Sequence, residues 1–385
     1  MMTDRISDQS IAIDYTAALE QGGGIGRYTR ELIAALAGLD SKTPYILFAA
    51  GQQMDRLPQP PGKNFTWRVS RRSSKWFARV WHRARVPIPV EYWTGPIKVL
   101  HAPDFTLPPT RGGTRTILTV HDLSFVRAPE TAPRRLRAYL NQVVPRSVRR
   151  ADLVLADSET TRRDLIELYQ TPSEKVHVLH SGVDDRFYPI DDQAILRQTR
   201  ERYGIGESPY IFSVGTVQPR KNYARLAEAL HRLNKPDLKL VIAGGKGWLD
   251  DPLYKRIEDL GLKGRVQFLG FVPDEDLPAL YSAARVFAFP SIYEGFGLPP
   301  LEAMACGTPV VAANTSSIPE VVGGAGLLVD PHDVEALTDA LSRAIEDESL
   351  RNQLTNQGQL RVQGFSWRTA ARQLQEHYAR LLRLP

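Results

Sequence analysis

The sequence has few of the residues and segments on which disulfide-bonded, thiolate-metal or membrane-spanning proteins depend. Its 385 residues include one cysteine, Cys306, which excludes an intrachain disulfide and a cysteine-based metal cage and suits a reducing compartment. No apolar run approaches the roughly 18 residues that span a bilayer. The segment Met1–Ser10 is polar, so neither a membrane span nor a signal peptide is expected. These absences predict a cytoplasmic protein.

A strong excess of one charge is also absent. The chain carries 49 Lys and Arg against 43 Asp and Glu, a formal net charge of +6. This modest excess suits an anionic ligand such as a nucleotide sugar, or an acidic membrane surface, and selects neither. Hydrophobic residues make up 42% of the chain, as in globular proteins, and a chain of this length usually forms two domains.

Short apolar runs alternate with amphipathic stretches such as Gly26–Leu39 along nearly the whole chain. The alternation predicts an α/β protein with two Rossmann-like, doubly wound parallel sheets, each covered by helices on both faces. A polar break at 184–193 places the domains at residues 1–190 and 191–365. Strands are expected at Ile11–Tyr15, Tyr45–Ala49, Val99–Ala102, Thr116–Val120, Leu153–Ala156, Lys175–Leu179, Tyr210–Val214, Leu238–Ala243, Arg265–Leu269, Val286–Phe289 and Pro309–Ala312.

The most specific motif is YEGFGLPPLEAMACGTPVV at residues 293–311. Proline suits the first turn of a helix, so a helix starting near Pro299 would direct its free N–H groups toward an anion in the preceding loop. Glu302 would lie on the first turn, where a carboxylate can accept hydrogen bonds from the two hydroxyls of a ribose. Glu294 would lie on the loop, beside a transferred sugar. Two glutamates alone would also fit an ordinary helix start.

A second motif, GTVQPRKN at 215–222, follows the first strand of the second domain. Arg220 supplies a rigid donor fork and Lys221 a point charge, and both suit a diphosphate leaving group. A diphosphate that departs in a transfer reaction gains negative charge, so cations held in place would stabilise the transition state. The alternative is a basic loop that caps a helix.

Two shorter motifs lie in the first domain. QGGGIGRY at 21–28 opens a helix with consecutive glycines, which let a ligand approach the backbone, although a glycine-rich turn alone is weak evidence. TVHDL at 119–123 places His121 at the carboxyl end of a strand. That histidine would face a ligand or be buried as a structural residue. Asp122 is placed either to orient the histidine ring or to engage an acceptor.

Two further stretches invite functional interpretations that compete with structural ones. Asp274, Glu275 and Asp276 match the D-x-D pattern of metal-using transferases, but they precede an amphipathic run and fit a helix cap better. We predict no metal. The stretch RRSSKWFARVWHRAR at 71–85 fits either a basic amphipathic helix on an anionic membrane or a helix whose aromatic side joins the core. It carries no recognised nucleic-acid motif.

Taken with their flanking residues, these motifs resemble the retaining GT-B glycosyltransferases of family 4 over almost the entire chain. The resemblance implies two Rossmann-like domains facing a central cleft, an acceptor domain at 1–190 and a nucleotide-sugar donor domain at 191–365, with the terminal helix 366–385 packed back on the first. It also implies residue roles. The catalytic residues would be His121 and Glu294, which contact the donor hexose, together with Asp122. Donor-binding contacts would come from Glu302 (ribose), Arg220 and Lys221 (phosphates), the amides of Phe296, Gly297 and Leu298, the backbone of Val272, and the Gly23–Gly24 loop.

The resemblance implies transfer of a hexose, with retention, from a nucleotide-diphosphate sugar to an acceptor hydroxyl in glycan or polysaccharide synthesis. Within the family, the chain most resembles the bacterial mannosyltransferase-like branch that builds surface polysaccharides. That branch points to GDP-mannose as the first choice of donor and a UDP-hexose as the second. The acceptor would be a glycan or a lipid-linked saccharide, which places the protein in the cytoplasm or peripherally on the inner face of the membrane. No cofactor and no nucleic acid are expected. Alternatives are a nucleotide-sugar-binding subunit with little catalysis, an epimerase of the same fold, or a phosphorylase, which would need a pyridoxal lysine and a longer chain.

Overall fold

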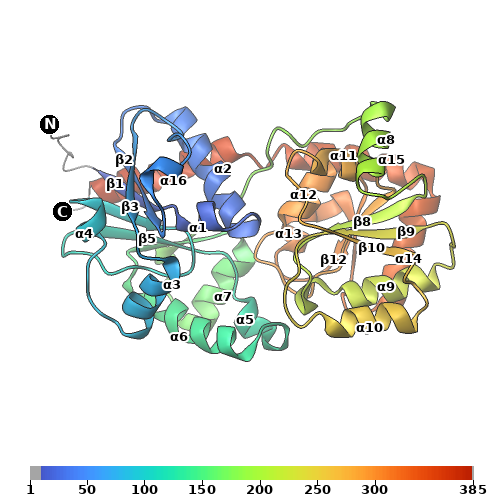
Figure 1. The fold of residues 1–385 in the computed structure, drawn as a ribbon, viewed down its shortest axis with the longest axis horizontal. Coiled ribbons are helices and arrows are strands. Elements are labelled where there is room, and N and C mark those ends of the chain that lie inside the picture. Colours follow the sequence, from blue (N-terminus) through green and yellow to red (C-terminus); the bar gives the residue numbers. More distant parts are fainter. Residues whose placement is uncertain (1–9, 384–385) are drawn as a thin grey trace. The chain divides into compact units, whose positions relative to one another are not determined.

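The computed structural model describes residues 10–383, and residues 1–9, on which the signal-peptide expectation rests, lie outside them. The chain divides into two compact units (Figure 1). Unit 1 comprises Met1–Leu123, Ala138–Gly182 and Trp367–Pro385, and unit 2 comprises Ser124–Arg137 and Val183–Ser366. The main segment of unit 2 thus begins at Val183, eight residues before the predicted start of the second domain at residue 191. The reason is a parallel bridge between Val183 and Ser366, in which the Val183 N–H donates to the carbonyl of Phe365 at 3.2 Å.

The sheet of unit 1 has seven strands in the order β3-β2-β1-β4-β5-β6-β7. All neighbours are parallel, so every strand ends at the same edge of the sheet. The chain builds outward from β1 to β3 and then crosses to the other side of β1, which makes the β1–β4 boundary the switch point of the sheet. The strands are β1 (Ile11–Asp14), β2 (Tyr45–Ala50), β3 (Phe65–Ser70), β4 (Val99–Ala102), β5 (Arg115–Val120), β6 (Leu153–Ala156) and β7 (Val176–Val178).

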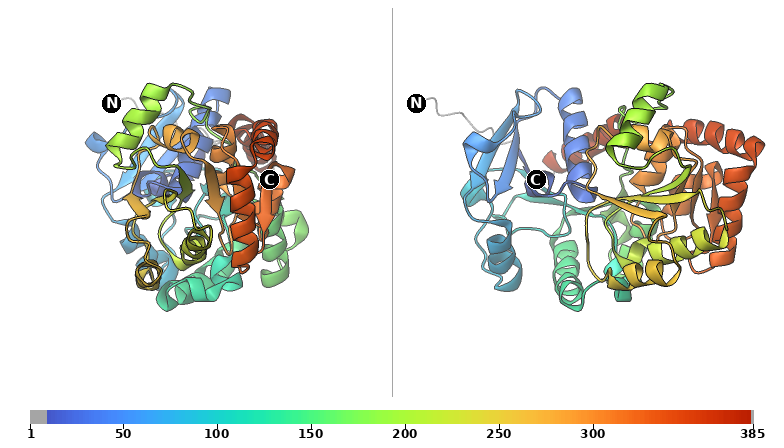
Figure 2. Two further views of the ribbon diagram at one scale, coloured as in Figure 1. Left: turned by 90° about the vertical axis from the view of Figure 1, so that its right-hand side faces the viewer. Right: turned by 45° about the vertical axis from the view of Figure 1, so that its right-hand side comes forward.

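Helices cover both faces of this sheet (Figure 2). The last helix, α16 (Trp367–Leu382), returns to unit 1 after the whole of unit 2 and packs against α2 (Gly24–Leu39). Tyr378 of α16 is buried and hydrogen-bonds through its hydroxyl to His101 Nδ1 at 2.8 Å. The remaining α-helices between β1 and β7 are α1 (Thr16–Glu20), α3 (Ser74–Phe77), α4 (Glu91–Thr94), α5 (Ser124–Arg127), α6 (Arg134–Arg150) and α7 (Glu159–Tyr169). Of these, α5 and the first residues of α6 belong to unit 2.

The sheet of unit 2 has six parallel strands in the order β10-β9-β8-β11-β12-β13. Successive strand residues point to opposite faces, and Ile211 and Phe212 of β8 accordingly belong to two different buried clusters. A sheet that is apolar on both faces must be covered on both. The strands are β8 (Tyr210–Val214), β9 (Lys239–Ala243), β10 (Val266–Gly270), β11 (Val286–Phe289), β12 (Val310–Ala313) and β13 (Gly326–Val329).

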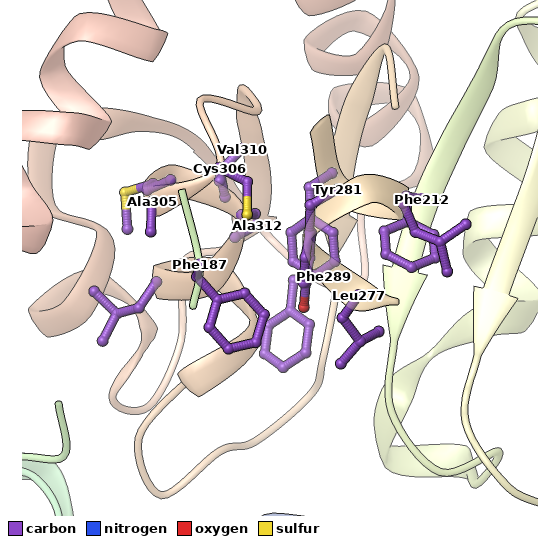
Figure 3. Packing of buried hydrophobic residues seen from close by; sticks show 14 of the residues in the cluster. Phe187, Phe212, Leu277, Tyr281, Phe289, Ala305, Cys306, Val310 and Ala312 are labelled. Atoms are coloured by element: carbon purple, nitrogen blue, oxygen red, sulfur yellow. The ribbon is translucent and has the colours of Figure 1, made fainter. Parts of the chain in front are cut away.

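One buried cluster of unit 2 surrounds Tyr281, whose ring packs on Phe187 and Phe212 (Figure 3). Cys306 lies in the same cluster and is buried, with no disulfide partner. The α-helices of unit 2 that follow β7 are α8 (Gln193–Arg202), α9 (Tyr223–Arg232), α10 (Asp251–Asp259), α11 (Leu277–Ser282), α12 (Leu298–Ala305), α13 (Ile318–Val322), α14 (Val334–Glu346) and α15 (Glu348–Val362).

The prediction of two parallel α/β sheets is therefore confirmed. Two strands were not predicted, β3 and β13, and each forms one edge of its sheet. Over residues 10–383, none of the helices has the length and apolar character needed to cross a bilayer.

Candidate functional site

The loop after β8 holds the two predicted cations. It contains a short 3-10 turn, Pro219–Lys221, and ends at Asn222, which adopts a left-handed conformation and donates to the carbonyls of Pro290 and Pro331. Gly215 starts the loop with φ of +151°, and a Cβ there would lie 2.8 Å from Lys221 Cε. The position therefore requires glycine for two reasons. A side chain would strain the backbone at this φ, and its Cβ would displace the Lys221 side chain.

Glu294 joins these cations into a buried cluster. Its two carboxylate oxygens lie 2.6 Å from Lys221 Nζ and 2.6 Å from an Arg220 guanidinium nitrogen. Lys221 Nζ also lies 4.7 Å from the centre of the Phe289 ring, a cation–π distance. Burial alone would raise the pKa of Glu294, but Arg220 and Lys221 outweigh it and lower that pKa to about 2. The carboxylate is therefore ionised at neutral pH.

The cluster pairs two cations with one carboxylate, so these three side chains carry one net positive charge. Glu294 and Lys221 are each 8% exposed, and charges in such surroundings interact more strongly than in water. Glu294 neutralises one of these two positive charges. A second anion, bound near Arg220 and Lys221, would neutralise the other. The arrangement therefore suits a ligand with at least one negative charge.

Two serines hold the loop that carries Glu294. Ser316 Oγ accepts from the Glu294 N–H at 2.9 Å, and Ser317 Oγ donates to the carbonyls of Glu294 and Phe296. Gly297 then adopts φ of +132° immediately before α12, a conformation that side chains disfavour. The sequence analysis missed both serines, because their pairing with this loop spans more than 20 residues and no local pattern marks it.

Glu302 lies deeper than the sequence suggested. Helix α12 begins at Leu298, so Glu302 is its fifth residue and opens the second turn rather than lying on the first. It is 2% exposed, and its carboxylate accepts from the Tyr281 hydroxyl at 2.8 Å. Val272 and Phe296 are both 5% exposed and pack in the cluster around Tyr281, so their side chains are core residues and only their backbones remain for ligand contacts.

The acidic run at 274–276 is occupied by ion pairs within unit 2. Asp276 pairs with Arg202 at 2.7 Å and accepts from the Tyr203 hydroxyl at 2.6 Å, and Asp274 lies 3.7 Å from Arg186. Asp276 is the N-cap residue of α11, as expected of a helix start, but its side chain makes no capping hydrogen bond. Among residues 10–383, no group of three or more His, Cys, Asp and Glu side chains is arranged to hold a metal ion.

His121 of unit 1 follows β5 and has both ring nitrogens occupied. Nδ1 lies 2.7 Å from a carboxylate oxygen of Asp157, and Nε2 lies 2.7 Å from the carbonyl oxygen of Pro103. A carbonyl only accepts, so Nε2 carries a proton. Burial disfavours the charged ring, but Asp157 outweighs it and raises the pKa of His121 to about 9. The imidazolium form therefore predominates at neutral pH.

Asp157, rather than the adjacent Asp122, orients the His121 ring. Asp157 directly follows β6, the strand beside β5, so the parallel register places it next to His121. Asp122 is half-buried. Burial raises the pKa of Asp157, and the negative charge of Asp122 raises it further. The signal for Asp157 was available in the sequence as an aspartate immediately after a predicted strand, but strand order is needed to pair it with His121.

The glycine-rich loop leads into α2. Gly23 is the N-cap residue of that helix, and Gly24 has φ of +45°, with open space where each Cβ would be. Gly26 is more restricted, because a Cβ there would lie 2.0 Å from the backbone oxygen of Gln21. The backbone thus requires glycine most strictly at Gly26, which the sequence analysis did not single out.

The basic aromatic stretch at 71–85 forms the short helix α3 followed by a π-helical turn, Ala78–Arg83. Phe77 and Trp81 are buried and pack on each other with ring centres 4.1 Å apart. These two rings belong to the core of unit 1, as the second alternative expected. Most of the exposed side chains of the stretch are basic and include Lys75, Arg79 and Arg83.

Comparisons with known proteins agree with this arrangement. The family model Glycosyltransferase Family 4 matches residues 22–187, and Glycosyl transferases group 1 matches 197–361. O-antigen chain mannosyltransferase B of Escherichia coli is 34% identical over 366 residues, which cover 91% of this chain and 94% of the relative. D-inositol 3-phosphate glycosyltransferase of Corynebacterium jeikeium is 35% identical over 277 residues, covering 69% of this chain and 65% of the relative.

Solved structures show the same fold at lower identity. Sucrose-phosphate synthase of Thermosynechococcus elongatus superposes with a TM-score of 0.74 at 24% identity, over 97% of this chain and 99% of the other. An Anabaena protein solved in complex with UDP and glucose gives 0.73 at 22% identity, over 96% and 99%. With its two parallel-sheet units and a relative aligned over nearly its whole length, this chain belongs to glycosyltransferase family 4 and has the GT-B fold.

Proposed function

We propose that the protein transfers a hexose, with retention and without a metal ion, from a nucleotide-diphosphate sugar to an acceptor hydroxyl during glycan or polysaccharide synthesis. The observation that carries the proposal is the buried cluster of Arg220, Lys221 and Glu294. It offers fixed positive charge at the carboxyl end of β8, where parallel sheets place their ligands. The family 4 relatives, which include mannosyltransferases, make GDP-mannose the first choice of donor and a UDP-hexose the second.

In this proposal Arg220 and Lys221 bind the diphosphate and stabilise the charge that it gains as the glycosidic bond breaks. Preorganised cations act best where water is excluded, and Lys221 is 8% exposed. Glu294 holds both cations in place and lies beside the transferred sugar. Glu302 binds the ribose, for which its hydrogen bond with the Tyr281 hydroxyl fixes the carboxylate.

Cations of the protein would supply the charge stabilisation that a divalent ion supplies in other transferases. The departing phosphate then takes the proton of the acceptor hydroxyl, and the new bond forms on the face that the leaving group vacates. The acceptor is a glycan or a lipid-linked saccharide. The exposed basic side chains at 71–85 are available for peripheral contact with an anionic membrane.

Donor hydrolysis in the presence of EDTA tests this proposal. The full chain, incubated with GDP-mannose, UDP-glucose and other nucleotide sugars, should release one nucleotide diphosphate in preference to the rest. Lys221→Ala should slow that release by roughly 10²- to 10³-fold, as the loss of a transition-state donor does. Lys263→Ala is the matched control, because Lys263 forms only a surface ion pair with Glu258.

Glu294→Gln keeps the size of the side chain and should also lose activity, with folding checked by circular dichroism. Turnover that disappears on chelation, or a Lys221→Ala enzyme as active as the control, would contradict the proposal. The anomeric configuration of the glycoside product, read by NMR, decides between retention and inversion.

A further inference from the structure

The polar atoms of His121 are all engaged by other residues of unit 1. Nδ1 lies 2.7 Å from Asp157 Oδ2, Nε2 lies 2.7 Å from the carbonyl oxygen of Pro103, and the His121 carbonyl accepts from the Thr161 hydroxyl at 3.1 Å. A sugar that bound this ring through an N–H would therefore have to replace either Asp157 or Pro103. The two contacts differ in strength and in the rigidity of their supports, so they are not equally exchangeable.

The contact with Asp157 is the stronger of the two. A hydrogen bond between charged groups is roughly twice as strong as one between neutral groups. Asp157 Oδ1 is buried and makes no hydrogen bond to any described residue, and Oδ2 bonds to His121. Loss of this contact would leave a buried carboxylate without a hydrogen-bonded partner, which is strongly unfavourable. We therefore expect Asp157 to hold the ring whether or not a ligand is bound.

The contact with Pro103 is weaker, because it joins the ring to a neutral carbonyl on a strained loop. The loop 103–106 follows β4, and within it Phe105 has φ of +47°, a region that side chains other than glycine seldom adopt. The Thr106 N–H donates to the carbonyl of Asp104, two residues earlier. A bond of this kind around a residue with positive φ defines a rare and strained γ-turn. Strain of this kind gathers at sites that change conformation on ligand binding.

Replacement of the Pro103 carbonyl by a sugar oxygen would cost little. Both are neutral acceptors, so the Nε2–H would exchange one hydrogen bond for another of similar strength. Release of the strain in the loop 103–106 would then favour the exchange. The structure thus combines one fixed anchor of the ring, Asp157, with one anchor that can yield.

The surroundings keep the ring protonated. Burial opposes its charge, but Asp157 and Asp104 outweigh burial and raise the pKa of His121 to about 9. A protonated ring has two N–H donors and no basic lone pair, so His121 can donate to a ligand but cannot take a proton from it. The other groups that face this ion pair through their rings or their charges are Tyr28 of α2, His101 of β4, Phe105, Asp122 and His180.

We propose that the Pro103 carbonyl holds the place of a ligand oxygen in the resting protein. When the donor binds, the Nε2–H of His121 passes from Pro103 to an oxygen of the donor hexose, while Asp157 keeps its hold on Nδ1. Asp157 is then a positioning residue of the reaction, and the loop 103–106 is the segment that moves. No proton is transferred, since the ring stays protonated before and after the exchange. The inference rests on the proposed transferase function, because the exchange needs a nucleotide sugar.

Nitrogen-15 NMR of the histidine rings in the full chain tests the exchange directly, with His121→Gln used to assign the signals. Both ring nitrogens of His121 should be protonated at pH 7.5. The probes are GDP-mannose and UDP-glucose, and the controls are GDP and UDP, which carry the diphosphate without the hexose. The nucleotide sugar that is hydrolysed should shift the Nε2–H signal and speed hydrogen exchange of the amides at 104–106. Its nucleotide should do neither, and the Nδ1–H signal should stay in place.

Donor hydrolysis at pH 6 and pH 8 tests the role of Asp157. With a pKa of about 9 the ring is mostly protonated at both values, so its titration should change the rate by less than about twofold. Asp157→Asn keeps the size of the side chain and an acceptor oxygen but removes the charge, so the pKa of His121 should fall to its ordinary value of 6.5 or lower. The rate of the variant should then drop by about 20-fold or more from pH 6 to pH 8.

Asp55→Asn is the matched control, because it makes the same substitution at an exposed acid of unit 1, and its two rates should follow those of the unsubstituted chain. The NMR measurement uses the unsubstituted chain, so it decides even where Asp157→Asn fails to fold. A neutral His121 ring at pH 7.5, an Nε2–H signal that the hexose does not shift, or a folded Asp157→Asn variant that follows the control would each overturn the inference. Any of these results beside donor hydrolysis refutes this inference alone, whereas hydrolysis of no nucleotide sugar refutes the proposed function.

Discussion

The pairing of His121 with Asp157 gives unit 1 a pH dependence at the scale of single residues. Asp157 raises the pKa of His121 to about 9 against the pull of burial, from an ordinary value of 6.5. A raised pKa means that the folded state holds the proton more tightly than the unfolded chain. The stabilisation is therefore complete below about pH 6.5 and lost as the pH rises through about 9.

We expect the free energy of unfolding of unit 1 to fall between pH 6.5 and 9 by about 3 kcal/mol, from 1.36 kcal/mol per pKa unit. Hydrogen exchange of unit 1 peptides across this range measures it. Asp157→Asn should abolish the slope, and the exposed Asp55→Asn should retain it. An unchanged slope in Asp157→Asn would show that other groups cause the dependence.

The sequence identified the residues of local motifs but not their distant partners. Arg220, Lys221 and Glu294 lie in two distinctive motifs, and the structure brings all three into contact. Asp14 and Asp157 also lie at or directly after strands, yet a single aspartate at a strand end is common and carries no signal alone. Only the strand order decides which such residues meet, and that order depends on packing over the whole sheet.

At the scale of elements, the start of α2 depends on one glycine. A Cβ at Gly26 would meet the Gln21 backbone oxygen at 2.0 Å and that of Ala17 at 2.9 Å. These are backbone atoms, so neither can move without shifting the loop. Gly38 lies in the same helix, is exposed and has no atom within 4 Å of an added Cβ.

Gly26→Ala should therefore destabilise unit 1 by about 1–3 kcal/mol, as overpacking does, whereas Gly38→Ala should stabilise it by about 0.5–1 kcal/mol through helix propensity. Urea unfolding of both variants, followed by hydrogen exchange in unit 1, measures the two effects. Equal effects of the two substitutions would show that the loop adjusts and that the close contact has no cost.

Element prediction found every interior strand and two of the four edge strands, β7 and β10, but missed the edge strands β3 and β13. Val99–Ala102 and Val286–Phe289 were predicted with their observed bounds, because a strand buried on both faces is a continuous apolar run. β3 reads FTWRVS, with Thr66 exposed, and β13 is four residues long with none of them fully buried. Edge strands need less apolar surface, so their composition differs little from that of loops.

At the scale of the molecule, unit 1 is completed by the last helix of the chain. Helix α16 follows unit 2 in sequence and packs on α2, and its buried side chains include Trp367 and Leu374. Tyr378 donates to or accepts from His101, whose other nitrogen contacts Thr119 at 3.0 Å. Burial lowers the pKa of His101 to about 3, so the neutral ring depends on these two hydroxyls for its hydrogen bonds.

We expect Tyr378→Phe to destabilise unit 1 by about 1–3 kcal/mol, the cost of leaving a buried polar atom unpaired, and to leave unit 2 unchanged. Removal of 367–385 should abolish cooperative unfolding of unit 1, because the face of α2 beneath α16 would be exposed to water. Calorimetry and peptide-resolved hydrogen exchange report the stability of the two units separately.

Arg372→Ala, at an exposed position of α16, is the control for Tyr378→Phe. If truncation lowered the hydrogen-exchange protection of both units equally, α16 would stabilise the whole chain. That result would contradict the expectation that this helix stabilises unit 1 alone.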